Sequence, residues 1–171
     1  RASIDTRAYI DGVKSLLPLA DIVKASDEDI DALQLGGDSR QAAMRAHGLM
    51  KSGMLVFTEG RGGAMLITEH GVIERAAYPV THVEDTVGAG DTFHSAFLAA
   101  LLRSGKLERP VSGIADDILG DAVDFACAAA AINVSRKGCS PPAQQEVEDF
   151  IAATRRSVTR LANSSLHSAS A

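Results

Sequence analysis

The stretch of sequence that decides the fold is Asp-Thr-Val-Gly-Ala-Gly-Asp at residues 85–91, and it is followed at once by an apolar run at 92–102. The glycines in this stretch allow the backbone to pass close to a ligand. The apolar run predicts a helix, whose first N–H groups have no partner within the helix itself. These N–H groups and the helix dipole favour an anion such as phosphate. The stretch therefore predicts a phosphate-binding turn, with the carboxylate of Asp91 facing the bound group.

A plainer explanation covers part of this pattern, because an aspartate at the start of a helix often serves only as a cap. The complete heptad favours a function instead. It resembles the C-terminal signature D-T-x-G-A-G-D of the PfkB-type (ribokinase-like) carbohydrate kinases, and every fixed position of that signature is present. The resemblance implies an α/β protein with the three-layer α/β/α ribokinase-like fold and a mainly parallel sheet. It is strongest for the fructokinase branch, to which residues 20–29 are similar.

Composition narrows the classes of protein that are compatible with this chain. The 171 residues are 46% hydrophobic, which is enough for one folded domain with a core. A net charge of −5 argues against a nucleic-acid partner. No apolar run reaches the length of a membrane span, so no membrane partner is expected. The two cysteines have no metal-binding spacing and fit a reduced, cytoplasmic protein.

The chain is expected to be part of a longer protein. It begins at Arg1 without a methionine, and its first strand-like segment comes only near Asp21. The resemblance implies that the first strands, the lid and most of the sugar site belong to a missing N-terminal half. Residues 1–162 would then form the C-terminal, nucleotide-binding and catalytic part, and 163–171 a mobile tail. Relatives often pair through the lid, so a homodimer is left open.

Hydrophobic spacing predicts strands that alternate with helices, which is typical of a layered α/β protein with parallel pairing. We expect helices at 5–17, 26–35, 38–49, 91–104, 116–134 and 144–161, and strands at 21–25, 54–58, 64–68 and 72–76. The last two strands form a hairpin around Glu69, His70 and Gly71. The alanine-rich part of the helix at 116–134 is expected to pack closely against a neighbour.

The resemblance assigns the catalytic roles to the heptad. Asp91 matches the base that accepts the proton of the sugar hydroxyl. The N–H groups of Gly88, Ala89, Gly90 and Asp91 would form the hole for the developing negative charge, which is a large catalytic effect in such sites. A carboxylate at a helix start is a weak base, which suits a loose transition state for phosphoryl transfer.

The resemblance also indicates where ATP would bind. Residues 58–63 are similar to a strand-end turn T-x-G-x-x-G, so Thr58, Gly60 and Gly63 are candidate ATP contacts, together with Thr86 in the heptad. A hairpin needs such glycines in any case. Cys127 falls near the adenine side, although a small buried core residue is an equally good explanation of this position.

Two candidate metal sites follow from the same resemblance. Asp29 lies where relatives have the acid of an N-x-x-E motif, which helps to place Mg²⁺ through water, but Ser26 replaces the asparagine. A helix start with favourable acids explains the segment about as well. Backbone carbonyls would surround a monovalent cation such as K⁺, and the residues that match are Asp85, Val87, Asn133, Arg136 and Gly138.

The function expected from the sequence is transfer of the γ-phosphate of ATP to a hydroxyl of a small, fructose-like sugar. Kinases for ribose, 2-keto-3-deoxygluconate or a nucleoside are alternatives within the family. A non-catalytic nucleotide-binding or regulatory module of the same fold is an alternative from another class. The expected partners are ATP and a small sugar.

Overall fold

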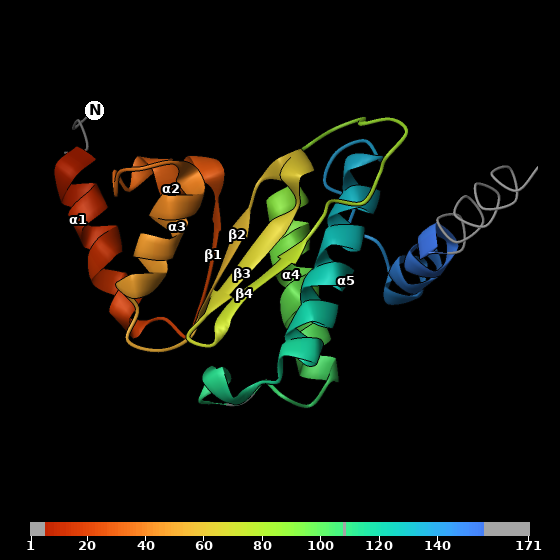
Figure 1. Cartoon of the computed structure of the whole chain (residues 1–171). Coiled ribbons are helices and arrows are strands. Elements are labelled where there is room, and N and C mark those ends of the chain that lie inside the picture. The colour runs from red at the N-terminus through yellow and green to blue at the C-terminus, as the bar shows by residue number, and fades with distance from the viewer. Residues whose placement is uncertain (1–5, 108, 156–171) are drawn as a thin grey trace, which may run out of the picture.

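Four strands form one sheet in the computed structural model, which describes residues 6–107 and 109–155 (Figure 1). The strands lie side by side in chain order. Their bounds are β1 (Ile22–Ser26), β2 (Met54–Thr58), β3 (Ala64–Thr68) and β4 (Gly71–Arg75). Strand β1 pairs with β2 in parallel, whereas β2–β3 and β3–β4 are antiparallel.

The expected mainly parallel sheet is therefore wrong for this part of the chain, where the sheet is mixed. The reason is the short loop between β3 and β4. A loop of so few residues can connect two antiparallel strands, whereas parallel strands need a long crossover. The parallel pair β1–β2 has the long helical crossover that such a pair requires. The layered α/β/α arrangement itself is confirmed.

Helices cover both faces of the sheet (Figure 1). Their bounds are α1 (Thr6–Leu16), α2 (Asp27–Ala32), α3 (Ser39–Gly48), α4 (Ala89–Arg103) and α5 (Asp116–Val134), and residues 144–155 are helical as well. Short 3₁₀ turns lie at Leu17–Leu19, Gly60–Gly62 and Val111–Gly113. None of the helices in the described ranges combines the length and apolar character that a bilayer span requires.

The side chains of β2 divide between two cores. Leu55 and Phe57 pack with α2 and α3, and Met54 and Val56 pack with α4 and α5. Because both faces are covered, β2 and β3 are continuously apolar rather than alternating. Helix α5 packs against α4, as its small alanine side chains predicted.

Most expected elements are present, and the differences have local causes. Helix α2 ends at Ala32 rather than at residue 35, because Gln34 adopts a left-handed backbone (φ 53°) before the glycines are reached. Helix α4 begins two residues early, at Ala89, since Gly88 already caps it. Leu17, expected at the end of the first helix, lies in a 3₁₀ turn. The expected helical residues 5 and 156–161 lie outside the described residues, as does the tail at 163–171.

Candidate active site

The turn at residues 85–91 opens α4 and is accessible. Gly88 is the N-cap and has a left-handed backbone with φ of 73°. The Ala89 N–H donates to the Thr86 carbonyl at 3.2 Å, so it serves the turn itself. The N–H groups of Gly90 and Asp91 lie in the first turn of α4, where a helix offers no acceptor. These two N–H groups are therefore the best placed of the predicted donors.

Asp91 points away from the core, because its side chain is exposed in the first turn of α4. Thr86, Val87 and Gly90 are exposed too, so packed atoms do not seal the turn. The next residue is different: Thr92 is only 5% exposed, and its Oγ1 has no hydrogen-bond partner among the described residues. The N–H groups of the first turn and the Asp91 carboxylate are thus both accessible at the start of α4.

The turn is held by polar contacts to a loop that follows α5. One oxygen of Asp85 accepts the Val87 N–H at 2.9 Å, and the other accepts the Gly138 N–H at 3.0 Å. These N–H groups hold the pKa of Asp85 below its usual range, and the Val87 N–H has the larger effect. Because the donors come from two segments, the carboxylate joins the turn to the loop at 138.

Asn133 makes a second connection between the same segments. Its side chain is fully buried at 0% exposure. The amide nitrogen donates to the Val87 carbonyl at 3.0 Å, and the amide oxygen accepts the Ser140 N–H at 2.9 Å. The sequence pointed only to the backbone of Asn133, yet the structure shows that its side chain organises the turn. A buried asparagine in an otherwise alanine-rich apolar helix is the signal that would have found this role.

The loop after α5 also lies directly over Gly88. A Cβ at Gly88 would overlap the sulfur of Cys139, whose side chain is exposed. Gly88 is thus required twice, by its left-handed backbone and by the closeness of the thiol.

A charged group of β1, Lys24, reaches the turn, and an acid of α2, Asp29, lies close in sequence to it. The Nζ of Lys24 lies 3.2 Å from the position that a Cβ of Gly90 would take. Asp29 forms a capping box with Ser26, in which Oδ2 accepts the Ser26 N–H at 2.8 Å. That N–H is the largest cause that lowers the pKa of Asp29, and the charge of Lys24 contributes. The contacts of Asp29 are those of a helix cap.

Lys24 was missed by the sequence reasoning. Its signal is a lysine in the middle of an apolar strand, because a strand covered by helices on both sides rarely carries a charge without a purpose.

The glycine turn after β2 lies at the same sheet edge as Ser26, since Ser26 and Thr58 are partners in the parallel register. Gly60 has φ of 53° and faces open space. Gly63 has φ of 98°, and a Cβ there would overlap the Arg75 carbonyl. Gly63 thus has a structural reason to be glycine, whereas the backbone at Gly60 is open to a ligand.

Cys127 lies in the core between the sheet and α4, with 6% exposure. Burial, followed by the charge of Asp124, raises the pKa of its thiol to about 12. A role as a small core residue thus explains why Cys127 is buried, and its contact with a nucleotide stays a prediction.

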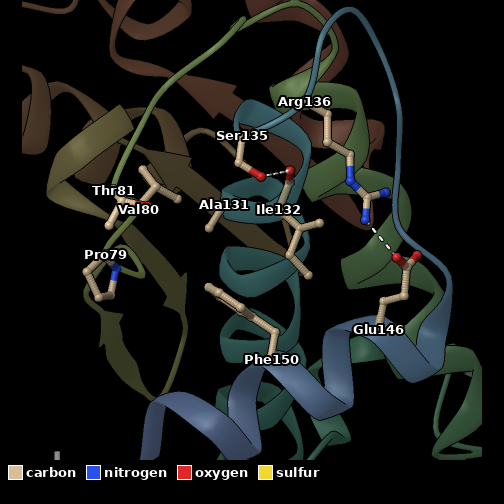
Figure 2. A pocket seen from close by; sticks show the side chains of 9 residues that line it. All are labelled: Pro79, Val80, Thr81, Ala131, Ile132, Ser135, Arg136, Glu146 and Phe150. Carbon is tan, nitrogen blue, oxygen red and sulfur yellow. Dashed lines mark hydrogen bonds and ion pairs between the residues drawn. The ribbon is translucent and has the colours of Figure 1, made fainter. Parts of the chain in front are cut away.

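A cavity of about 380 Å³ adjoins the end of α5 (Figure 2). Its walls are the segment 79–81, the last turns of α5 and the helix at 144–155. Figure 2 shows Phe150 reaching toward α5 beside Ile132, and Arg136 in an ion pair with Glu146 at 2.7 Å. The turn at 85–91 contacts the same C-terminal end of α5, because the Asp85 N–H donates to the Val134 carbonyl at 3.3 Å.

Metal ligands do not cluster in the described ranges: no group of three or more His, Cys, Asp or Glu side chains there is arranged to hold a metal ion.

Comparisons with known proteins agree with this geometry. The family model described as pfkB family carbohydrate kinase matches residues 2–146. The chain is 34% identical over 138 residues to a probable fructokinase-5 of Arabidopsis thaliana, which covers 80% of this chain and 40% of that protein. It is 37% identical over 122 residues to a fructokinase of Rhizobium leguminosarum bv. trifolii, covering 70% of this chain and 36% of that protein.

Among solved structures, the chain is similar to the aminoimidazole riboside kinase of Salmonella enterica, solved with aminoimidazole riboside and an ATP analogue. The TM-score is 0.73 at 26% identity, over 86% of this chain and 47% of that one. The chain thus spans less than half the length of these relatives.

Proposed function

Because this chain belongs to the pfkB family of carbohydrate kinases, we propose that it supplies the nucleotide-binding and catalytic part of an ATP-dependent sugar kinase. The observation that carries the proposal is the open start of α4, where the exposed carboxylate of Asp91 adjoins the N–H groups of Gly90 and Asp91 itself. Such a site suits transfer of the γ-phosphate of ATP to a sugar hydroxyl, with ADP and a sugar phosphate as products.

In the proposed reaction the sugar oxygen attacks the γ-phosphorus while the bond to the β-phosphate oxygen breaks. Asp91 accepts the proton that the hydroxyl loses. The N–H groups at the start of α4 stabilise the negative charge on the phosphoryl oxygens, because pre-oriented donors need no rearrangement as that charge develops. A weak base suffices, since a loose transition state asks for little activation of the hydroxyl.

ATP would extend from this turn along the sheet edge. Thr58, Gly60, Gly63 and Thr86 are proposed contacts to its phosphates and ribose. The end of α5, with the cavity in Figure 2, is proposed to adjoin the adenine. Cys127 would act there only through packing, because its side chain is buried.

Mg²⁺ would neutralise the charge of the phosphates when it is bound. The proposed protein contact is Asp29 through water, and the fit is partial. Its Oδ2 already accepts hydrogen bonds from the N–H and hydroxyl of Ser26. The carboxylate is ionised near neutral pH, as such a role requires, and the Ser26 N–H lowers its pKa further.

A monovalent cation such as K⁺ would bind to carbonyls of two segments that the fold brings together, 85–87 and 133–138. The bond between Asp85 and the Gly138 N–H supports this arrangement. The carbonyls of Val87 and Asn133 each accept a hydrogen bond already, from the Asn133 amide and the Arg136 N–H. Turnover with K⁺ replaced by Na⁺ tests the site, and an unchanged rate would contradict it.

We propose a fructose-like sugar as the acceptor, supported by the relatives named as fructokinases. Ribose, 2-keto-3-deoxygluconate and nucleosides are alternatives within the same reaction. A cytoplasmic location is supported by the free thiols of Cys127 and Cys139, and a homodimer is proposed only from the family resemblance.

The decisive experiment measures ADP release by the full-length protein with ATP and a panel of these sugars. The proposal expects release that depends on a sugar, with fructose giving the highest kcat/KM. ADP release that is independent of every sugar would indicate an unproductive ATPase, and nucleotide binding without any ADP release would favour the non-catalytic nucleotide-binding module.

A further inference from the structure

Lys24 is a cation near the phosphate turn to which the proposed reaction gives no role. It lies in β1 opposite Val56, which packs in the core shared with α4 and α5. Ile22, two residues before, packs against the same core. Because side chains two residues apart in a strand share a face, Lys24 extends on the α4 side of the sheet.

The end of this side chain reaches the first turn of α4. Nζ lies 3.2 Å, and Cε 3.9 Å, from the position of a Cβ on Gly90. Only the absence of a side chain at Gly90 allows this approach. Lys24 is partly buried and takes part in none of the ion pairs found within the described ranges.

This position is electrostatically unfavourable for a cation alone. The start of a helix carries a partial positive charge of about half an elementary charge, which repels an ammonium group, and Asp91 in the same turn forms no ion pair with Lys24 among the described residues. The charge of Lys24 contributes to the lowered pKa of Asp29, but the Asp29 carboxylate already accepts hydrogen bonds in the capping box of α2. An anion bound between the Lys24 ammonium group and the start of α4 would be attracted by both, and it would offset their mutual repulsion.

We propose that Lys24 binds the phosphoryl group that is transferred, so that this group is held between the Lys24 ammonium and the N–H groups at the start of α4. The inference rests on the proposed kinase function and adds a residue to it. An ammonium group has three donors on a flexible stem, so it can follow the phosphoryl oxygens as they move from ADP to the sugar. Lys24 would therefore discriminate ATP from ADP.

The test compares Lys24→Met with the matched control Lys51→Met, in which an exposed lysine outside the site is replaced. Titration calorimetry on the full-length protein measures affinity for a non-hydrolysable ATP analogue and for ADP. We expect Lys24→Met to weaken the analogue about 10- to 100-fold, the usual range for a bond to a charged group, with ADP changed by less than about threefold. Lys24→Arg, which keeps the charge, should lose less.

Equal effects of Lys24→Met on the two nucleotides, or no effect on either, would overturn the proposal. The outcome is separable from that of the kinase proposal, because binding is measured without turnover. A protein that phosphorylates no sugar but loses ATP discrimination on Lys24→Met would contradict only the reaction. Sugar-dependent ADP release that is unchanged in Lys24→Met would contradict only the role of Lys24.

Gly90→Ala supplies a second variant that is expected to fold. Gly90 lies in a helix without a left-handed backbone, so alanine there should not destabilise α4. The new methyl group would press on the Lys24 ammonium and weaken the ATP analogue at an unchanged or higher Tm. If both residues act through one contact, the double variant should bind no worse than the weaker single variant. Additive losses would contradict the shared contact.

Discussion

The side-chain amide of Asn133 donates to the Val87 carbonyl at 3.0 Å and thereby connects the end of α5 to the turn at residues 85–91. The same side chain accepts the Ser140 N–H, so one buried residue connects three parts of the chain. The geometry of the turn thus depends on a helix that begins well after it in the sequence.

Asn133→Ala should therefore destabilise the protein. It removes two hydrogen bonds at partly buried positions, to the Val87 carbonyl and from the Ser140 N–H, and each is worth about 0.5–1.5 kcal/mol. Urea unfolding followed by circular dichroism measures the loss. Ser135→Ala is the control, because the Ser135 hydroxyl donates to the Ile132 carbonyl of its own helix and connects no distant segment within the described ranges. Equal unfolding midpoints for the two variants would show that the Asn133 bonds contribute nothing.

Gly88→Ala should be destabilised by more than about 1 kcal/mol, because alanine is strained at a left-handed φ and its methyl group meets Cys139. Adding Cys139→Ala should recover part of this loss, since it removes the overlapping sulfur but not the backbone strain. Thermal unfolding of the two single variants and the double variant measures the coupling. A double variant no more stable than Gly88→Ala would refute the contact with the thiol.

Asp91→Asn should lower kcat by several orders of magnitude and leave ATP affinity within about threefold, because the amide cannot accept the proton of the hydroxyl. Steady-state kinetics and nucleotide titration on the full-length protein measure the two effects. Asp121→Asn, on the exposed face of α5, is the control. Turnover close to that of the unaltered protein would remove Asp91 from the role of base.

Stability should fall in acid partly through Asp85. Its pKa in the folded protein is below the ordinary value of 3.8, because the N–H groups of Val87 and Gly138 stabilise the carboxylate. A carboxyl whose pKa is lowered by folding stabilises the folded state. This stabilisation is fully present above the pKa of the unfolded state and is lost as pH falls through the pKa of the folded state. Asp85→Asn should thus be less stable than the unaltered protein at pH 7, with the difference shrinking below about pH 4.

Unfolding midpoints at pH 3 to 7 check this expectation, with Asp121→Asn again as the control. A difference between the unaltered protein and Asp85→Asn that is constant over the whole range would refute the contribution of the carboxylate.

Much of the fold was predictable from local patterns. Residues 54–58 read as a strand because apolar side chains run without a break, and β2 has these bounds. Residues 116–134 read as a helix and form α5. The end of α2 was missed, because nothing in the residue type of Gln34 announces a left-handed backbone. The expected hairpin already implied an antiparallel pair, but the family resemblance favoured a mainly parallel sheet.

The site was predictable only in part. The heptad predicted the turn at the start of α4, because glycine turns and helix starts depend on near neighbours, and the roles of its glycines and Asp91 stay predictions. The sequence did not reveal that Lys24 reaches Gly90 or that the side chain of Asn133 holds Val87.

By itself the sequence determined the chemical character of this protein: a glycine turn at a helix start, a carboxylate in that turn and strands apolar enough to be buried. These properties lie within short segments, where backbone freedom, capping and side-chain period act between near neighbours. The tertiary structure alone decided which distant groups meet at the turn. Lys24 comes from β1, Gly138 and Cys139 follow α5, and their approach depends on how helices and sheet pack, which no local pattern encodes.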